Sequence, residues 1–117
     1  MPSVLLLDAD RNFREALAIS LRLDGFQVVG SAAADEAIRW LDAAHFDACV
    51  ADARTPGLDA VADAASRTGA RMVLTGPHPD LLALAVRRLE GAAALPKPFG
   101  AAELAARIAR VQVPSAG

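Results

Sequence analysis

Short apolar runs alternate with amphipathic segments along the whole chain, and this alternation constrains the fold more than any other feature. Each run holds three or four residues, a length typical of buried strands, and is apolar throughout except for Gln27 in the second run. A segment with helical spacing of apolar residues follows each run. The expected strands cover residues 4–7, 26–29, 48–51, 72–74 and 92–95, and the expected helices cover residues 11–24, 35–44, 58–66, 81–89 and 101–111. Strict alternation needs crossover connections, so it predicts a parallel sheet with helices on both faces.

The length of 117 residues fits one domain with one core. We therefore expect an α/β fold, a doubly wound five-stranded parallel sheet with flavodoxin-like strand order 2-1-3-4-5. Residues 1–112 form the expected domain, and residues 113–117 read as a C-terminal tail or the start of a linker.

Charge and cysteine usage narrow the class of protein. The formal net charge of −2 lacks the basic footprint of a nucleic-acid binder, so no direct nucleic-acid partner is expected. The single cysteine, Cys49, rules out an internal disulfide and favours a reducing compartment. No signal peptide or membrane-length apolar stretch is recognisable, which predicts a cytoplasmic protein with no membrane partner.

Polar residues follow the expected strands at the points where those strands end. Asp8 and Asp10 follow the first strand, Asp52 the third, Thr75 the fourth, and Lys97, the one lysine of the chain, the fifth. The carboxyl ends of parallel strands meet at one edge of a sheet, which is where ligands bind in open α/β sheets. These groups are therefore expected to converge.

The chemistry of such a cluster points to phosphate. Carboxylates brought together need a cation, and Mg²⁺ takes one or two carboxylates plus a phosphate. A nearby ammonium and hydroxyl suit phosphoryl oxygens, and an aspartate in that setting is a competent nucleophile toward phosphorus. The residues alone thus predict a phosphoryl-binding or phosphoryl-accepting carboxylate site.

Four segments in this order resemble the receiver domain of two-component response regulators: residues 4–10, 52–59, 73–76 and 97–99. The resemblance implies that Asp52 is the phosphoryl acceptor, that Thr75 and Lys97 contact the phosphoryl group, and that Lys97-Pro98 is a cis bond. It further implies weak Mg²⁺ binding by Asp8, Asp52 and the backbone carbonyl of Arg54, with Asp10 as an optional further ligand.

The resemblance also implies a signalling role. The chain would not be an enzyme, but a relay that takes a phosphoryl group from a histidine kinase or a histidine phosphotransfer protein and passes a conformational change to a downstream effector protein. Homodimerisation through the face formed by the fourth helix, fifth strand and fifth helix is an open alternative.

Three features depart from the family pattern. Ala9 stands where a second metal-binding acid is usual, Ala94 stands where an aromatic residue is usual, and the spacing from Asp52 to Thr75 is short. The short spacing predicts a short third helix or a clipped loop. Ala9 keeps a second interpretation open, namely a degenerate receiver that acts as a phosphorylation-independent interaction module.

Several polar residues have ordinary structural explanations. Asp10 directly precedes a helical segment and is favoured as its N-cap, and Asp35 and Asp59 read as acids in a first helical turn. Cys49 lies in an apolar strand and is expected in the core rather than as a nucleophile.

Overall fold

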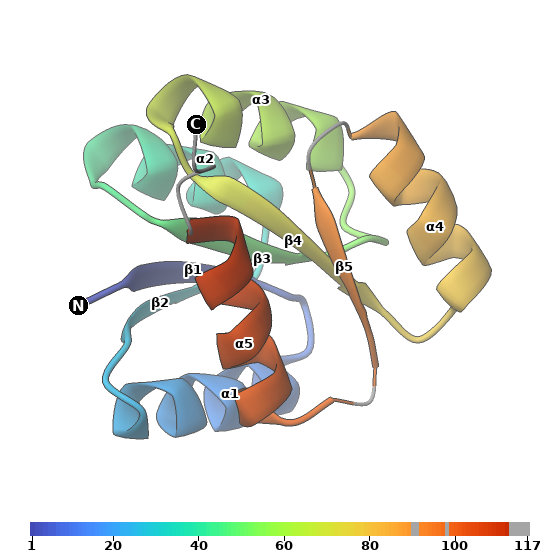
Figure 1. Ribbon diagram of the computed structural model, residues 1–117. Coiled ribbons are helices and arrows are strands. Elements are labelled where there is room, and N and C mark those ends of the chain that lie inside the picture. Colours follow the sequence, from blue (N-terminus) through green and yellow to red (C-terminus); the bar gives the residue numbers. More distant parts are fainter. Residues whose placement is uncertain (90–91, 98, 113–117) are drawn as a thin grey trace, which may run out of the picture.

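A computed structural model describes residues 1–89, 92–97 and 99–112 of the chain. In this part the protein forms a five-stranded, wholly parallel sheet in the order β2-β1-β3-β4-β5, with helices α1 to α5 between and after the strands (Figure 1). The strands are β1 (Ser3–Leu7), β2 (Gln27–Ser31), β3 (Ala48–Asp52), β4 (Arg71–Gly76) and β5 (Ala93–Pro96). The helices are α1 (Arg11–Leu23), α2 (Ala34–Ala43), α3 (Leu58–Thr68), α4 (Pro79–Arg88) and α5 (Ala101–Gln112). The predicted fold class and strand order are confirmed.

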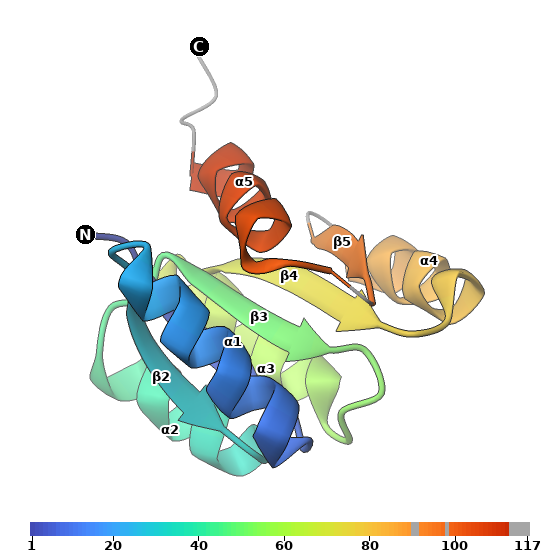
Figure 2. The same cartoon turned by 90° about the horizontal axis from the view of Figure 1, so that it is seen from below.

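Helices cover the sheet on both faces (Figure 2). Helices α1 and α5 lie on one face, and α2, α3 and α4 lie on the other. Strand β1 shows why both faces are apolar: Val4 and Leu6 pack toward α1 and α5, whereas Leu5 and Leu7 pack toward the opposite layer. Successive side chains of a strand point to opposite faces, so a strand buried on both sides must be apolar throughout.

The short connection between β3 and β4 comes from a clipped loop. Helix α3 extends to Thr68, two residues beyond the predicted end, and Gly69 caps it with a φ of 83°. Strand β4 then begins at Arg71. At the other end of α3, Gly57 has a φ of 81°, a left-handed conformation that glycine adopts without strain, and this turn brings the chain from β3 back onto the sheet.

The buried stripe of α4 differs from the expected one. Helical spacing over residues 81–89 places Leu81, Leu84 and Ala85 on one apolar side, but Leu81 and Leu84 are 53% and 60% exposed. Helix α4 instead buries Leu82 and Ala85, with Val86 and Leu89 packed against the same core cluster. The stripe from Leu82 to Leu89 runs over two helical turns, so it covers more of the sheet than a stripe from Leu81 to Ala85 would.

Two predictions fall on residues outside the described part of the chain. These are the tail at 113–117 and the cis bond, which involves Pro98. Ala94, in place of the usual aromatic residue, is half-buried in β5 and packs against the core cluster under α4.

Candidate phosphoryl-acceptor site

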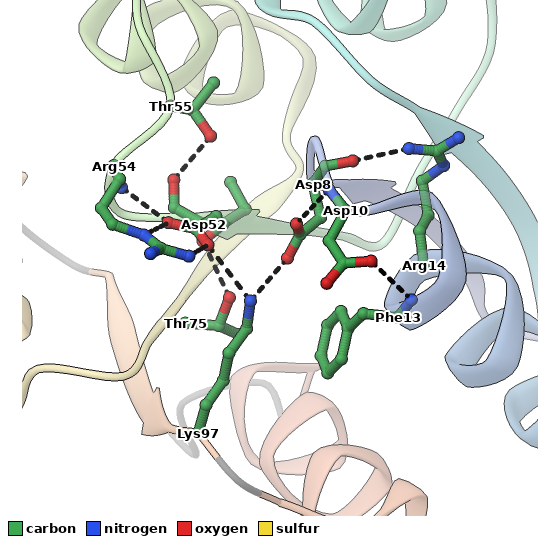
Figure 3. Close-up of polar contacts among 10 residues, drawn as sticks. Asp8, Asp10, Phe13, Arg14, Asp52, Arg54, Thr55, Thr75 and Lys97 are labelled. Atoms are coloured by element: carbon green, nitrogen blue, oxygen red, sulfur yellow. Dashed lines mark hydrogen bonds and ion pairs between the residues drawn. The ribbon is translucent and has the colours of Figure 1, made fainter.

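The sheet brings four predicted site residues to one edge. Asp8 directly follows β1, Asp52 ends β3, Thr75 is the register partner of Asp52 on β4, and Lys97 directly follows β5. Strand β3 lies between β1 and β4, so Asp52 sits at the centre of the group. Asp8 and Asp52 are only 6% and 4% exposed, and Thr75 is buried. Four segments far apart in sequence thus meet in one small volume (Figure 3).

Lys97 bridges the two buried carboxylates. Its Nζ lies 2.8 Å from Asp8 Oδ2 and 3.1 Å from Asp52 Oδ2. The ammonium also lies 4.2 Å from the centre of the Phe13 ring, whose face attracts a cation, and Phe99 packs edge-on against that ring. The predicted convergence of Lys97 with Asp8 and Asp52 is present, and Phe13 is a supporting contact that the sequence analysis did not identify.

Arg54 makes a second, unexpected cationic contact with Asp52. Its Nε donates to Asp52 Oδ1 at 3.0 Å, its second guanidinium nitrogen donates to Oδ2 at 2.7 Å, and its backbone N–H donates to Oδ1 at 2.8 Å (Figure 3). The family resemblance implies a role only for the backbone carbonyl of Arg54, not for its side chain. The sequence does place an arginine two residues after Asp52, the last residue of β3. Only the turn after β3 decides that the Arg54 side chain points back to Asp52.

The two cations control the ionisation of Asp52. Burial opposes the charged carboxylate and raises its pKa, but the hydrogen bonds from the Arg54 side chain and backbone and from Lys97 outweigh that effect. Together they lower the pKa of Asp52 from 3.8 to about 2. Asp52 is therefore a carboxylate at any physiological pH.

The remaining predicted residues divide into structural and site roles. Asp10 accepts a hydrogen bond from the N–H of Phe13 and so caps α1, as favoured, while its own N–H donates to Asp8 Oδ1 at 2.9 Å. The Thr75 hydroxyl donates to the backbone carbonyl of Ala51 at 3.5 Å. Cys49 is buried in β3, and burial raises the pKa of its thiol to about 12, so it is a core residue.

A cavity of about 680 Å³ opens beside the two carboxylates. Its lining combines polar groups with small side chains: Asp8, Ala9, Asp10, Ala32, Ala33, Ala34, Asp52, Arg54, Thr55 and Pro56. The alanines leave room, and Arg54 and the carboxylates give one wall its charge. The cavity is large enough for a phosphoryl group and its donor to approach Asp52.

The carboxylate oxygens that this cavity offers as ligands fit a resident Mg²⁺ poorly. Ala9 provides no carboxylate, and the Asp8 and Asp52 oxygens already accept hydrogen bonds from Lys97, Arg54 and the Asp10 N–H. Within the described residues, no group of three or more histidine, cysteine, aspartate or glutamate side chains is arranged to hold a metal ion. Every buried side-chain nitrogen or oxygen in that part of the chain also has a hydrogen-bond partner.

The sheet order and the two helical layers give the chain the fold of response-regulator receiver domains, as solved structures show. Among solved structures, a putative response regulator from Chloroflexus aurantiacus matches with a TM-score of 0.84 and 24% identity, covering 97% of this chain and 100% of that one. The chemotaxis protein CheY4 of Vibrio cholerae matches with a TM-score of 0.82 and 22% identity, covering 95% of this chain and 98% of that one.

A curated relative extends this likeness to the sequence. The chain is 36% identical over 109 residues to the C4-dicarboxylate transport transcriptional regulatory protein DctD of Rhizobium meliloti (strain 1021). The match covers 88% of this chain but 24% of that protein, so the chain spans about a quarter of its relative. No family model matches the chain. The resemblance to response-regulator receiver domains, first drawn from four short segments, is confirmed.

No described helix combines the length and the apolar character that a membrane crossing requires.

Proposed function

We propose that this chain is a phosphoryl-accepting signalling domain with Asp52 as the acceptor. One observation carries the proposal: a buried carboxylate at the centre of the sheet edge is held ionised by cations beside an open cavity. A carboxylate oxygen of Asp52 attacks the phosphorus of the donor, and the new O–P bond forms as the bond from phosphorus to the leaving group breaks. The leaving group departs with the bonding electron pair, as acetate does from acetyl phosphate.

Lys97 and Thr75 are the proposed partners of the transferred group. The Lys97 ammonium already contacts Asp52 Oδ2 and is held from the other side by Asp8, so it stands ready to pair with a phosphoryl oxygen. Thr75 is the register neighbour of Asp52 and carries a hydroxyl that makes only a long hydrogen bond to Ala51. Thr75 is the one residue of β4 with a side-chain hydroxyl, and we assign this hydroxyl to a phosphoryl oxygen.

The partners follow from this role. We propose a histidine kinase or a histidine phosphotransfer protein as the donor, and a downstream effector protein as the recipient of the signal. The exposed Leu81 and Leu84 on α4 give the effector, or a second copy of the chain, an apolar surface to contact. With Ala94 in β5, the conformational change cannot include a turning aromatic ring at that position. A cytoplasmic location stays a prediction.

Intact mass spectrometry tests the acceptor. The chain is incubated with acetyl phosphate, with and without Mg²⁺, and we expect a mass gain of one phosphoryl group. Asp52→Asn should abolish the gain, whereas Asp59→Asn, an exposed aspartate in the first turn of α3, should leave it unchanged.

A wild-type chain that gains no mass under either condition would contradict the proposal. It would favour the phosphorylation-independent interaction module, which the comparisons do not specifically support. A gain that survives Asp52→Asn would place the acceptor elsewhere.

A further inference from the structure

Arg54 occupies the side of Asp52 that faces the cavity. Its guanidinium donates one hydrogen bond to each oxygen of the carboxylate, and Arg54 also lines the cavity wall. This fork-like pairing is the strongest geometry available to an arginine and a carboxylate. A cation bound to the same two oxygens has to displace it.

The two buried carboxylates of the site are balanced in charge without any further ion. Asp8 and Asp52 contribute two negative charges, and Lys97 and Arg54 contribute two positive charges at hydrogen-bond distance. Asp10, the third carboxylate of the cavity lining, accepts the N–H of Phe13 with one oxygen, and Ala9 adds no further carboxylate. A divalent cation entering this site would meet a guanidinium and an ammonium that already pair with the two buried carboxylates, which disfavours its binding.

We propose that Arg54, and not a divalent cation, is the resident counter-charge of Asp52 in this protein. Arg54 keeps Mg²⁺ from binding tightly and supplies the positive charge that the transferred phosphoryl group needs. The second half of this inference rests on the proposed phosphoryl-acceptor function, whereas the first half does not.

Arg54 has the freedom that this role requires. Its side chain is 55% exposed, while that of Asp52 is 6% exposed. The guanidinium can therefore leave one carboxylate oxygen as that oxygen attacks phosphorus, and then donate to the phosphoryl oxygens, which match its planar donor pair. Lys97, with 14% exposure and two carboxylate partners, stays in place and holds the other side.

A Mg²⁺ titration followed by amide chemical shifts in NMR tests the first half directly and needs no phosphorylation. For the wild-type chain we expect no saturation up to about 10 mM. Arg54→Ala should tighten Mg²⁺ binding roughly tenfold, because a positive charge next to the cation is gone, and adding Ala9→Asp should tighten it further. Arg67→Ala is the matched control, since Arg67 pairs with the exposed Asp42 on the α2–α3 side of the molecule.

Two results of the titration would overturn the inference. One is submillimolar Mg²⁺ binding by the wild-type chain, and the other is an Arg54→Ala variant that binds Mg²⁺ no better than Arg67→Ala does.

Phosphorylation rates with acetyl phosphate, in EDTA and in 10 mM Mg²⁺, test the second half. The wild-type rates should agree within about twofold, and Arg54→Ala should lose roughly tenfold or more in EDTA, the equivalent of one charge-assisted hydrogen bond. Strict Mg²⁺ dependence of the wild-type chain would refute this inference while leaving the acceptor function intact. No phosphorylation in any condition would refute both the acceptor function and the second half, and the titration would still decide the first.

Discussion

Replacing Lys97 by methionine removes the one ammonium that joins Asp8 to Asp52 and keeps most of the side-chain stem. Two charge-assisted hydrogen bonds are lost, at 2.8 and 3.1 Å, each worth about 1.5–3 kcal/mol. Because Asp52 keeps Arg54, the loss should be smaller than the sum. We expect Lys97→Met to lower the free energy of unfolding by about 3 kcal/mol at pH 7, the low end for breaking a buried ion pair.

The pH dependence separates lost charge pairing from lost packing. Without the ammonium, two buried carboxylates lie close together, and acid relieves this repulsion by placing a proton on one of them. The loss measured in urea denaturation, followed by circular dichroism, should therefore fall to about half between pH 7 and pH 4. In an Asp8→Asn background, Lys97→Met should lower the free energy of unfolding by about 1 kcal/mol less than in the wild-type chain, because only one carboxylate is left without the ammonium.

Arg67→Ala serves as the control and should cost less than about 0.5 kcal/mol, because its ion pair with Asp42 is exposed. A Lys97→Met loss below 1 kcal/mol at pH 7, or a loss of the same size at both pH values, would refute the assignment of Lys97 as the bridge of a buried charge cluster.

Three further predictions concern the stability of the chain in acid, the reactivity of the Cys49 thiol and the packing of Leu74 in the core. The pKa of Asp52 is lower in the folded chain than its ordinary value of 3.8, so its stabilising contribution is present above pH 3.8 and is lost as the pH falls toward 2. We expect this contribution to the free energy of unfolding to be about 1 kcal/mol, because solvent around the half-exposed Arg54 weakens the pairing. Asp52→Asn should remove the corresponding pH dependence of the unfolding free energy. Cys49 should react with iodoacetamide only as fast as the chain unfolds, so rapid labelling of the native protein would contradict its burial. Leu74→Ala should cost about 2–5 kcal/mol in urea denaturation, and a cost below 1 kcal/mol would contradict its place in the core between β3 and β5.

Local patterns predicted most of the fold because the sheet is buried on both faces. Apolar runs such as the one around Leu5 and Leu6 are typical of a central strand, and the alternation with helices then favours a parallel sheet. The side of a helix that is buried was less predictable. Helix α4 offers two apolar stripes, one with Leu81 and Leu84 and one with Leu82 and Ala85, and only packing against the sheet selects the second.

The sequence by itself determined that Asp8, Asp52 and Lys97 gather at the site, since each directly ends or follows a strand and parallel strands end together. Only the tertiary structure decided how those groups share charge. The turn after β3 folds the Arg54 guanidinium back onto Asp52, and the segment after β5 places Lys97 between Asp8 and Asp52. Spacing along a chain fixes which residues reach an edge, but the direction of a long side chain depends on the loop that carries it and on the charges it meets there.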